Sequence, residues 1–461
     1  MSENQFSSLP LSSELLTVLQ ELGFAEMTPI QQESLPLLLA GKDIIGQAKT
    51  GSGKTAAFAL PILNKIKIEE SYLQALILCP TRELATQVVG EIRKLGRRLP
   101  GLQVLSLTGG QSGREQVQSL ENGVQIAVGT PGRVADFVTR NRVDLSAVKT
   151  VVLDEADKML DMGFADEIKT VMSDLPGSRQ TVFFSATFPE SIEHLSRKYQ
   201  RHVTPVIIEE EESNAIEQLV YDCEDDDKAN TLLRVLQQHP SDSTIVFCNT
   251  RIAVDTLADL LTQQGVPAGA LHGDMEQRER DRVMALFRNK SHRILVATDV
   301  AARGLDIDHL ELVINFDLPL SPEIYVHRIG RTGRAGKTGV AVTLAHPKDT
   351  LKLTAFSEAT GGKFQRPSLG FKNQYGLNKN LREAPMRTLS ISGGRKDKLR
   401  PGDILGALTG DAGIAGTEVG KIEIQDKISY VAVSNKMADT ALQKLRDGRI
   451  KGQKFQVKFV K

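Results

Sequence analysis

The sequence predicts an α/β protein made of two consecutive parallel-sheet domains and a small C-terminal α+β domain. Short β-branched runs alternate with longer stretches of helical period from about residue 76 to residue 208, which predicts a parallel sheet covered by helices on both faces. The same alternation restarts after an acidic segment. Near Gly361 the composition changes, as Gly, Lys, Arg, Asn and Pro accumulate. A chain of 461 residues has room for two to four domains of about 100–200 residues each.

The expected strands and linkers define the domain boundaries. Four consecutive glutamates at 209–212 bury nothing, so they are interpreted as a solvated linker. We expect a first domain at 1–208, a linker at 209–213, a second domain at 214–362, a linker at 363–385 and a C-terminal domain at 386–461. Strands are expected at 75–78, 104–107, 126–128, 150–153, 181–184 and 206–208, then at 244–247, 268–271, 293–297, 312–315 and 340–344.

Composition limits the kinds of partner and the cellular compartment that we expect for the protein. Lys+Arg and Asp+Glu balance at 57 each, so any basic surface must come from uneven distribution. Cys79, Cys223 and Cys248 lie far apart, mostly in apolar runs, and predict buried thiols without a zinc site or a disulfide framework. No signal peptide and no apolar run of about 20 residues is present, which favours a cytoplasmic protein without a membrane partner. We expect a monomer.

A phosphate-binding loop is expected after the apolar pair Ile44-Ile45. The loop precedes a helical stretch, so the strand–loop–helix context of a P-loop is present. Glycines let backbone N–H groups approach phosphate oxygens, the lysine reaches the terminal phosphates, and the last hydroxyl is suited to Mg²⁺. The alternative is an ordinary glycine turn. The residues of this loop are Ala48, Lys49, Thr50, Gly51, Ser52, Gly53, Lys54 and Thr55.

A second nucleotide element follows the buried run at 151–153. Asp154 and Glu155 stand at the carboxyl end of this strand, the edge at which ligands bind in α/β sheets. Asp154 can hold Mg²⁺ through water, and Glu155 can orient and partly deprotonate an attacking water. The alternative is a helix N-cap. Because a P-loop is also present, catalysis is favoured.

At this point the chain resembles the DEAD-box family of RNA helicases, over most of its length. Gly23-Phe24 with Thr28-Pro29-Ile30-Gln31 is similar to the family's Q motif, and Phe6 occupies its isolated upstream aromatic position. The resemblance implies RecA-like P-loop domains. It also implies that Gln31 binds the adenine edge, with Phe24 beside the base and Thr28 in the same site, so that ATP is the substrate and Mg²⁺ the cofactor.

Further motifs carry the same resemblance in the first domain. Backbone N–H groups, hydroxyls and arginines after predicted strands suit a sugar-phosphate backbone and are blind to base identity. Taken alone, each motif is equally typical of a turn or a cap. The resemblance implies RNA contacts at Thr81, Arg82, Gly110, Thr130, Pro131 and Arg133, and coupling of hydrolysis to strand separation at Asp157, Ser185 and Thr187.

The second domain carries the family's remaining motifs. A guanidinium keeps its charge near pH 7 and suits the γ-phosphate charge of a transition state, so Arg331 and Arg334 are the expected arginine fingers. His327 in the same motif is expected to couple the two activities, and Asp306 to contact the nucleotide. The RNA contacts implied here are Arg251, Gly273, Thr298 and Arg303.

The C-terminal region is basic, with about fifteen Lys/Arg against about eight Asp/Glu from residue 384 onward. Its expected order βαββαβ is that of an RNA-recognition motif, but the central strands offer only Tyr430 for base stacking. Binding through loop cations is therefore expected, with Arg400 and Lys451 among them. The region resembles DbpA-type bacterial DEAD-box proteins, which implies a hairpin of large-subunit (23S) ribosomal RNA as partner, in large-subunit precursors. The alternative is a generic basic tail.

The expected function is ATP-dependent local unwinding of short RNA duplexes in large ribosomal subunit assembly. Two alternatives keep the same motifs: an ATP-gated RNA clamp, and a generic RNA chaperone without ribosomal RNA specificity. A DNA helicase is a third, disfavoured by the Q motif and by the C-terminal fold.

Overall fold

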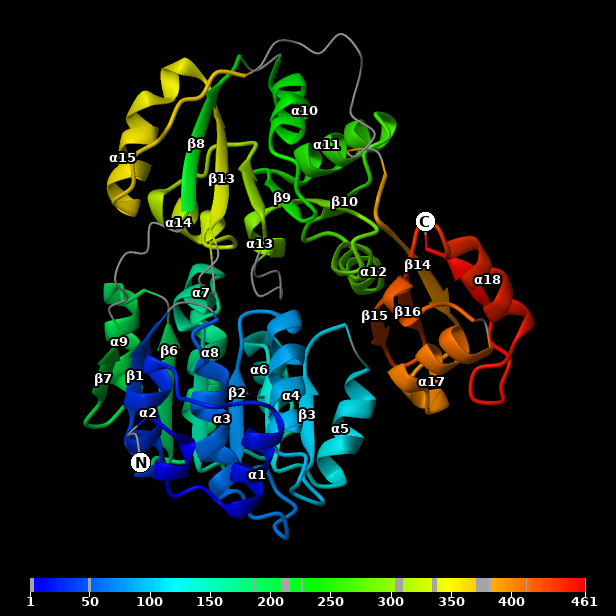
Figure 1. Cartoon of the computed structure of the whole chain (residues 1–461). Coiled ribbons are helices and arrows are strands. Elements are labelled where there is room, and N and C mark those ends of the chain that lie inside the picture. The colour runs from blue at the N-terminus through cyan, green and yellow to red at the C-terminus, as the bar shows by residue number, and fades with distance from the viewer. Residues whose placement is uncertain are drawn as a thin grey trace. The chain divides into compact units, whose positions relative to one another are not determined.

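A computed structural model describes residues 4–48, 51–110, 112–185, 187–208, 216–224, 227–302, 310–333, 338–369, 381, 383–411 and 413–460. The chain divides into two compact units, the first made of residues 1–212 and 304–306 and the second of residues 213–303 and 307–461 (Figure 1). No helix within the described ranges is both long and apolar enough to span a bilayer. The three cysteines are free and buried, as predicted.

The first unit contains a parallel sheet of seven strands in the order β3-β4-β2-β5-β6-β1-β7. Each strand is short, and alternate residues face opposite sides, so both faces are apolar and both need a helical layer. The strands are β1 (Ile44–Gln47), β2 (Ala75–Leu78), β3 (Val104–Leu107), β4 (Ile126–Gly129), β5 (Thr150–Asp154), β6 (Gln180–Ser185) and β7 (Thr204–Ile207).

Two separate cores cover the two faces of this sheet. One joins Ile77 and Phe184 to helices α1 to α4, and the other joins Leu76 and Phe183 to helices α6 to α9. A two-layer cover of this kind is the predicted α/β arrangement. The helices are α1 (Ser13–Glu21), α2 (Pro29–Leu39), α3 (Lys54–Lys65), α4 (Arg82–Leu95), α5 (Gly113–Glu121), α6 (Pro131–Thr139), α7 (Ala156–Asp161), α8 (Ala165–Asp174) and α9 (Glu190–Tyr199).

The second unit begins with another parallel sheet, of six strands in the order β10-β11-β9-β12-β13-β8. Its edge strand β8 was not among the expected strands, because it directly follows the acidic segment and mixes Glu217, Gln218 and Asp222 with apolar residues. The elements are β8 (Ile216–Asp222), α10 (Lys228–Gln238), β9 (Thr244–Phe247), α11 (Arg251–Gln263), β10 (Ala268–Leu271), α12 (Gln277–Arg288), β11 (Ile294–Ala297), α13 (Asp299–Ala302), β12 (Leu312–Asn315), α14 (Pro322–Ile329), β13 (Gly339–Ala345) and α15 (Thr350–Thr360).

The chain after α15 first runs along the edge of this sheet. Gln365 exchanges backbone hydrogen bonds with β8, from Val220 N at 2.8 Å and to Gln218 O at 2.9 Å. Arg366 Nη1 lies 2.9 Å from both carboxylate oxygens of Asp222. Residues 364–366, predicted to belong to a linker, therefore contact the second parallel-sheet domain instead.

The C-terminal domain has an antiparallel sheet of four strands in the order β15-β16-β14-β17, and the predicted βαββαβ order is confirmed. Leu389, Ile391, Val431 and Val433 point from one face of the sheet into a core with its two helices. The elements are β14 (Met386–Ile391), α17 (Pro401–Gly406), a π-helical turn (Ala407–Asp411), β15 (Val419–Ile424), β16 (Ser429–Ser434), α18 (Ala438–Asp447) and β17 (Val457–Phe459).

Candidate active site and RNA interface

The first sheet places its predicted functional loops at one edge, in two neighbouring groups. The P-loop follows β1, and Asp154 and Ser185 are the last residues of β5 and β6; these three strands are adjacent. Loops that follow β3, β4 and β2 carry the predicted RNA contacts, and these strands are adjacent too. Because carboxyl ends of parallel strands share one edge, the sheet brings a nucleotide group and an RNA group side by side.

In the described part of the P-loop, the backbone conformation at position 53 and the space around it require a glycine. Gly53 adopts φ +94°, a left-handed conformation that favours glycine, and it caps helix α3. A Cβ at this position would meet the amide of Gln31. Lys54 begins α3 and is buried, and its Nζ donates to Ala48 O at 2.7 Å. The lysine is thereby folded over the loop, and Thr55 follows it in the first turn.

The Q-motif residues hold this loop from outside. Thr28 Oγ1 donates to Ser52 O at 2.7 Å, and Gln31 Nε2 donates to Gly53 O at 3.0 Å. Gln31 Oε1 also accepts from Thr28 N at 3.0 Å, which caps helix α2. Phe24 packs edge-on against Phe6, with ring centroids 6.1 Å apart. The motif therefore has a structural task beside the adenine contact that the resemblance implies.

The two acidic residues at the end of β5 are buried, and one of them forms an ion pair with a lysine. Asp154 is 3% exposed and Glu155 is 4% exposed. Glu155 has φ +55° and ψ 50°, a left-handed conformation that is uncommon for a residue with a side chain. Its Oε1 lies 2.7 Å from Lys158 Nζ in an ion pair that is almost fully buried on both sides. Strain and buried charge together are typical of a functional site.

Burial raises the pKa of Asp154 to about 6, with Glu155 adding to the rise while Lys54 opposes it. Such a carboxyl gains a positive partner readily, because a cation relieves the cost of its buried charge. Within the described ranges no three His, Cys, Asp or Glu side chains gather as they would around a metal held by protein alone. Mg²⁺ usually takes one or two protein oxygens together with phosphates and water, so Asp154 and the hydroxyl of Thr55 fit it beside a bound nucleotide.

Asp157 connects the acidic segment to the end of β6. Its Oδ2 accepts from Thr187 N at 3.0 Å and from Thr187 Oγ1 at 2.9 Å. Ser185 O accepts from Ala48 N at 3.1 Å, which continues the connection to the P-loop. Ser185 Oγ is buried and has no hydrogen-bond partner among the described residues. The three predicted coupling residues of this domain are thus in one chain of contacts with the nucleotide loop.

The predicted RNA residues of the first unit also lie together. Thr81 caps α4 by accepting from Leu84 N at 3.3 Å, and the guanidinium of Arg82 lies over Gly109, beside Gly110. Arg133, in the first turn of α6, donates to Gln116 Oε1 at 3.1 Å. Thr130 and Pro131 form the start of α6, where Thr130 makes no side-chain cap. Helix starts and glycines offer N–H donors, which suit phosphate oxygens.

The second sheet repeats this arrangement of loops. Arg251 follows β9, Gly273 follows β10 and Thr298 follows β11, and these three strands are adjacent. Arg251 forms an exposed ion pair with Asp274, which joins two of the loops. Thr298 is buried, whereas Arg251 and Gly273 are exposed. The second unit therefore presents an exposed arginine and an exposed glycine at one edge.

Arg328, next to the predicted coupling residue His327, connects several described motifs of the second unit through hydrogen bonds. It is 1% exposed, and both carboxylate oxygens of Asp299 accept from it at 2.7 and 2.8 Å. It also donates to Asn249 Oδ1, Asn315 Oδ1 and Asp317 O at 2.8, 3.3 and 2.6 Å. Arg328 joins the loops after β9, β11 and β12. Arg331 follows it and is 6% exposed, and its carbonyl accepts from Leu310 N at 3.2 Å.

Two residues with evident roles were missed by sequence reasoning. Lys158 follows Glu155 by three residues, so helical spacing could have indicated their ion pair. Arg328 lies in the same motif as His327 and Arg331, but the sequence does not reveal which arginine of a series is buried. Five predicted site residues lie outside the described residues, namely Lys49, Thr50, Arg303, Asp306 and Arg334.

In the C-terminal domain, Arg400 and Lys451 lie around one carboxylate. Asp403 Oδ2 accepts from Arg400 N at 2.9 Å and lies 3.6 Å from Lys451 Nζ. Lys451 Nζ also donates to Lys398 O at 2.8 Å, so the loops 395–400 and 449–454 are neighbours. These loops carry the predicted RNA-binding cations. Tyr430, in contrast, is 4% exposed and offers little surface for base stacking.

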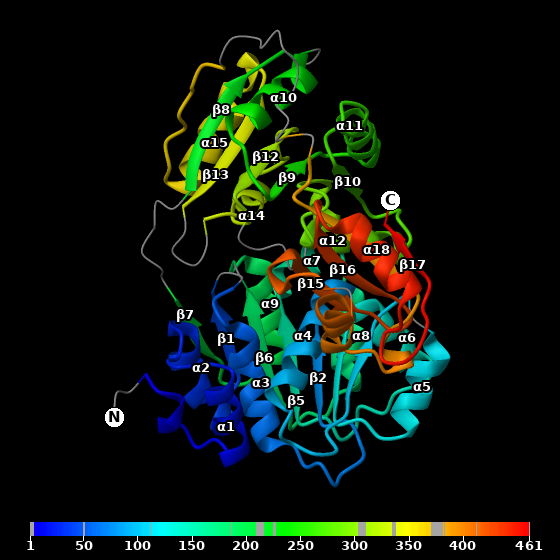
Figure 2. The same cartoon turned by 45° about the vertical axis from the view of Figure 1, so that its right-hand side comes forward.

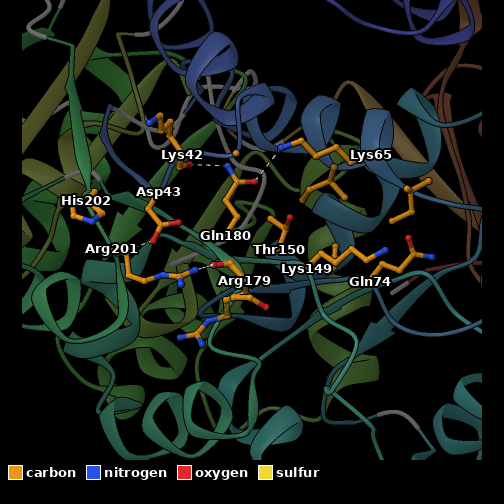
Figure 3. A pocket seen from close by; sticks show the side chains of 15 residues that line it. Lys42, Asp43, Lys65, Gln74, Lys149, Thr150, Arg179, Gln180, Arg201 and His202 are labelled. Carbon is orange, nitrogen blue, oxygen red and sulfur yellow. Dashed lines mark hydrogen bonds between the residues drawn. The ribbon is translucent and has the colours of Figure 1, made fainter.

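The opposite edge of the first sheet carries a basic cavity of about 560 Å³. Figure 3 shows Lys65 pointing toward the side-chain amide of Gln180 and Arg201 pointing toward the backbone of Arg179. Lys65 Nζ donates to Leu38 O at 2.7 Å and Arg179 Nη1 to Pro176 O at 2.9 Å, both near helix carboxyl ends. Asp43 is buried and accepts from backbone N–H groups of Thr181 and Arg201, each at 2.8 Å. Lys65 and Arg179 thus satisfy carbonyl oxygens near helix carboxyl ends, which is a structural role.

Comparisons with known proteins agree with this geometry. Models of the DEAD/DEAH box helicase domain, the helicase conserved C-terminal domain and the DbpA RNA binding domain match residues 28–195, 227–336 and 388–459. The chain is 48% identical to the ATP-dependent RNA helicase DbpA of Escherichia coli over 97% of both chains. The chain belongs to the DEAD-box RNA helicases of the DbpA type.

Other family members match the two parallel-sheet domains. The CshA helicase of Geobacillus kaustophilus is 44% identical over 78% of both chains. The structure of S. cerevisiae Dbp5 bound to RNA and ADP BeF3 is 34% identical with a TM-score of 0.72, and the match covers 79% of this chain and 95% of that one. As a DEAD-box helicase the chain is an RNA-binding ATPase that unwinds RNA with ATP, and the predicted RecA-like and RNA-recognition-motif-like fold is confirmed.

Proposed function

We propose that the C-terminal domain directs this helicase to a hairpin of large-subunit (23S) ribosomal RNA, and that the protein acts there, as a monomer, in assembly of the large subunit. The adjacent basic loops 395–400 and 449–454 are the observation that carries this proposal. Loop cations grip phosphates by shape, whereas a stacking sheet would read single bases. A folded hairpin is a ligand that such loops can recognise.

For ATP hydrolysis we assign each buried group of the first edge a task. Lys54 neutralises the terminal phosphates, and Thr55 and Asp154 hold Mg²⁺, which supplies charge neutralisation at the phosphates when bound. Glu155 orients the attacking water and accepts its proton, and its ion pair with Lys158 fixes the position of the carboxylate. Arg331 and Arg334 meet the γ-phosphate charge that develops in the transition state.

Coupling to RNA runs through the contact of Asp157 with Thr187. Because Ser185 O bonds the P-loop at Ala48 and Thr187 bonds the acidic segment, a shift at the phosphates moves the end of β6. The binding of RNA beside the neighbouring strands β2, β3 and β4 then depends on which nucleotide is bound. A strand bent by the bound helicase cannot remain stacked in a duplex, and a short helix opens locally.

A panel of ribosomal RNA fragments tests the choice of RNA. We expect one hairpin to stimulate the ATPase of the full chain at much lower concentration than fragments of equal length. Lys451→Gln and Arg400→Gln should each weaken binding of that hairpin. Each should also reduce the slope of log affinity against log salt by about 0.7–0.9 for every phosphate that the variant no longer neutralises. Strand displacement on the same RNA separates unwinding from clamping.

Lys436→Gln is the matched control, since Lys436 is exposed in the same domain and lies at the other end of helix α18 from the 449–454 loop. Equal stimulation by every fragment would refute ribosomal RNA targeting. If Lys436→Gln weakened hairpin binding as much as the loop variants do, the C-terminal domain would act only as a generic basic tail.

A further inference from the structure

A cation stands shortly before each of four adjacent strands of the first sheet, at the edge opposite the P-loop. In the order of the sheet these strands are β5, β6, β1 and β7, and the amino ends of parallel strands share one edge. The cations therefore gather in space although they lie far apart in the sequence (Figure 2). They line the basic cavity of about 560 Å³ and are Lys149 before β5, Arg179 before β6, Lys42 before β1 and Arg201 before β7, joined by Lys65 at the end of α3.

The lining of this cavity carries more positive charge than the helix ends around it require. Asp43 supplies the carboxylate among the lining residues, and its two oxygens already accept from backbone N–H groups. Glu70, outside the lining, pairs with Lys149 at 3.3 Å. Helices α2, α3 and α8 end near the cavity, and each carboxyl end counts as roughly half a negative charge. The five cations exceed the negative charge of all these groups.

The excess of positive charge has a cost, which is visible at two of the cations. Burial lowers the pKa of Lys65 and that of Arg179. At Arg179 the charge of Arg201 lowers the pKa further, while Asp43 opposes the change. Both cations bond to neutral carbonyl oxygens, which satisfy their N–H groups but compensate no net charge. An anion in the cavity would relieve this cost.

Lys42 and Arg201 are the cations best placed to receive such an anion. Both side chains are exposed, and Lys42 Nζ has no hydrogen-bond or ion-pair partner in the part of the chain that the structure describes. Arg201 Nη2 donates to Arg179 O at 2.9 Å, and a guanidinium has five N–H donors in all. Figure 3 shows Lys42 and Arg201 on one side of the cavity and Lys65 and Lys149 on the other. A ligand that reaches both sides must carry more than one negative group.

We propose that this cavity is a second anion site of the helicase, which takes a compact polyphosphate, either inorganic or the phosphate tail of a nucleotide. Its volume lies within the range of roughly 300–1,000 Å³ that is typical of small-ligand pockets. RNA is a poorer fit, because the predicted RNA loops of this sheet lie at the other ends of the strands. A bound polyphosphate would join the starts of β1, β5, β6 and β7. It would stabilise the first unit and leave RNA-stimulated ATPase unchanged.

Titration calorimetry of tripolyphosphate into the full chain tests the proposal. Because the P-loop also binds phosphates, the titration uses Lys54→Ala as its background, in buffer without Mg²⁺. We expect one site that Lys42→Gln and Arg201→Gln each weaken about tenfold, through loss of a charge-assisted contact. Orthophosphate should bind at least tenfold more weakly, since it reaches one side only. GTP carries the same three phosphates on a nucleoside: tighter binding of GTP would assign the site to nucleotides, and tighter binding of tripolyphosphate to the inorganic ligand.

Thermal melting and a distant cation supply the controls. Lys42→Gln changes an exposed residue and should melt at the original temperature without ligand, whereas saturating tripolyphosphate should raise the melting temperature by several degrees only where Lys42 is present. Arg400→Gln removes a cation of the C-terminal domain and should leave the titration unchanged. Affinity that survives both Lys42→Gln and Arg201→Gln, or that falls equally in Arg400→Gln, would overturn the proposal. Displacement of tripolyphosphate by a short RNA duplex would also overturn it, because the cavity would then belong to the path of the RNA.

Discussion

The two parallel sheets present functional loops at the same edge but hold buried charge differently. At the first sheet, Lys54, Asp154, Glu155 and Lys158 are all 6% exposed or less, and Glu155 is held in a left-handed conformation. At the second sheet, the buried guanidinium of Arg328 donates five hydrogen bonds. The first edge concentrates ionisable groups against each other. The second edge surrounds the cation of Arg328 with hydrogen-bond acceptors.

This difference separates groups poised for chemistry from groups that maintain structure. The raised pKa of Asp154 shows that burial costs outweigh its positive neighbours, so a bound cation would stabilise it. Arg328 gains nothing from a ligand, because its donors already have partners. Substitutions should therefore damage catalysis at the first edge and stability at the second.

The largest effect is expected at Glu155. Glu155→Gln removes the base for the attacking water at nearly constant volume, and loss of general base catalysis lowers rates by about 10²–10⁴-fold. RNA-stimulated ATP turnover should fall by that factor, while the affinity for ATP stays within a few-fold of the original.

Thermal unfolding of the same variant is its control. The partner Lys158 is left buried with a neutral amide, so a modest loss of stability is expected, but the folded fraction at assay temperature should be unchanged. Full turnover in Glu155→Gln would show that another group activates the water.

The next effect concerns the second edge. Arg328→Ala leaves the partly buried Asp299 without its cation, and breaking a buried ion pair typically costs about 3–5 kcal/mol. Hydrogen exchange should accelerate in strands β9, β11 and β12, whose loops Arg328 joins, and Arg328→Lys should fall between because it cannot bond both carboxylate oxygens in a plane. Arg366→Ala is the control in the same unit, since its ion pair with Asp222 is exposed and worth less than about 1 kcal/mol. Equal effects of the two alanine variants would remove the structural assignment of Arg328.

Most of the strands and the loops of both edges could be predicted from the sequence, because short apolar runs and glycine spacing are local properties of the chain. The contacts between distant segments could not be predicted from it. The hydrogen bonds of Gln31 and Thr28 to the P-loop span more than twenty residues, and those of Arg328 reach back to Asn249. The edge strand β8 was not predicted, because polar residues interrupt the run of apolar residues by which the other strands were recognised. The burial of Thr388 and Ser390 in the C-terminal sheet could not be predicted either, since polar residues that alternate with apolar ones along a strand normally face solvent.

The smallest effect is expected at the amino edge of the first sheet, where the basic cavity lies. Arg179→Gln removes hydrogen bonds to the carboxyl end region of α8, which should lower stability by about 1 kcal/mol. RNA-stimulated ATPase should not change, because this edge lies at the opposite ends of the strands from the P-loop. Lys42→Gln, another cation lining the cavity, should change neither quantity. If Arg179→Gln instead reduced turnover as Glu155→Gln does, the nucleotide chemistry would depend on both ends of the strands, and the division between a catalytic edge and a capping edge would fail.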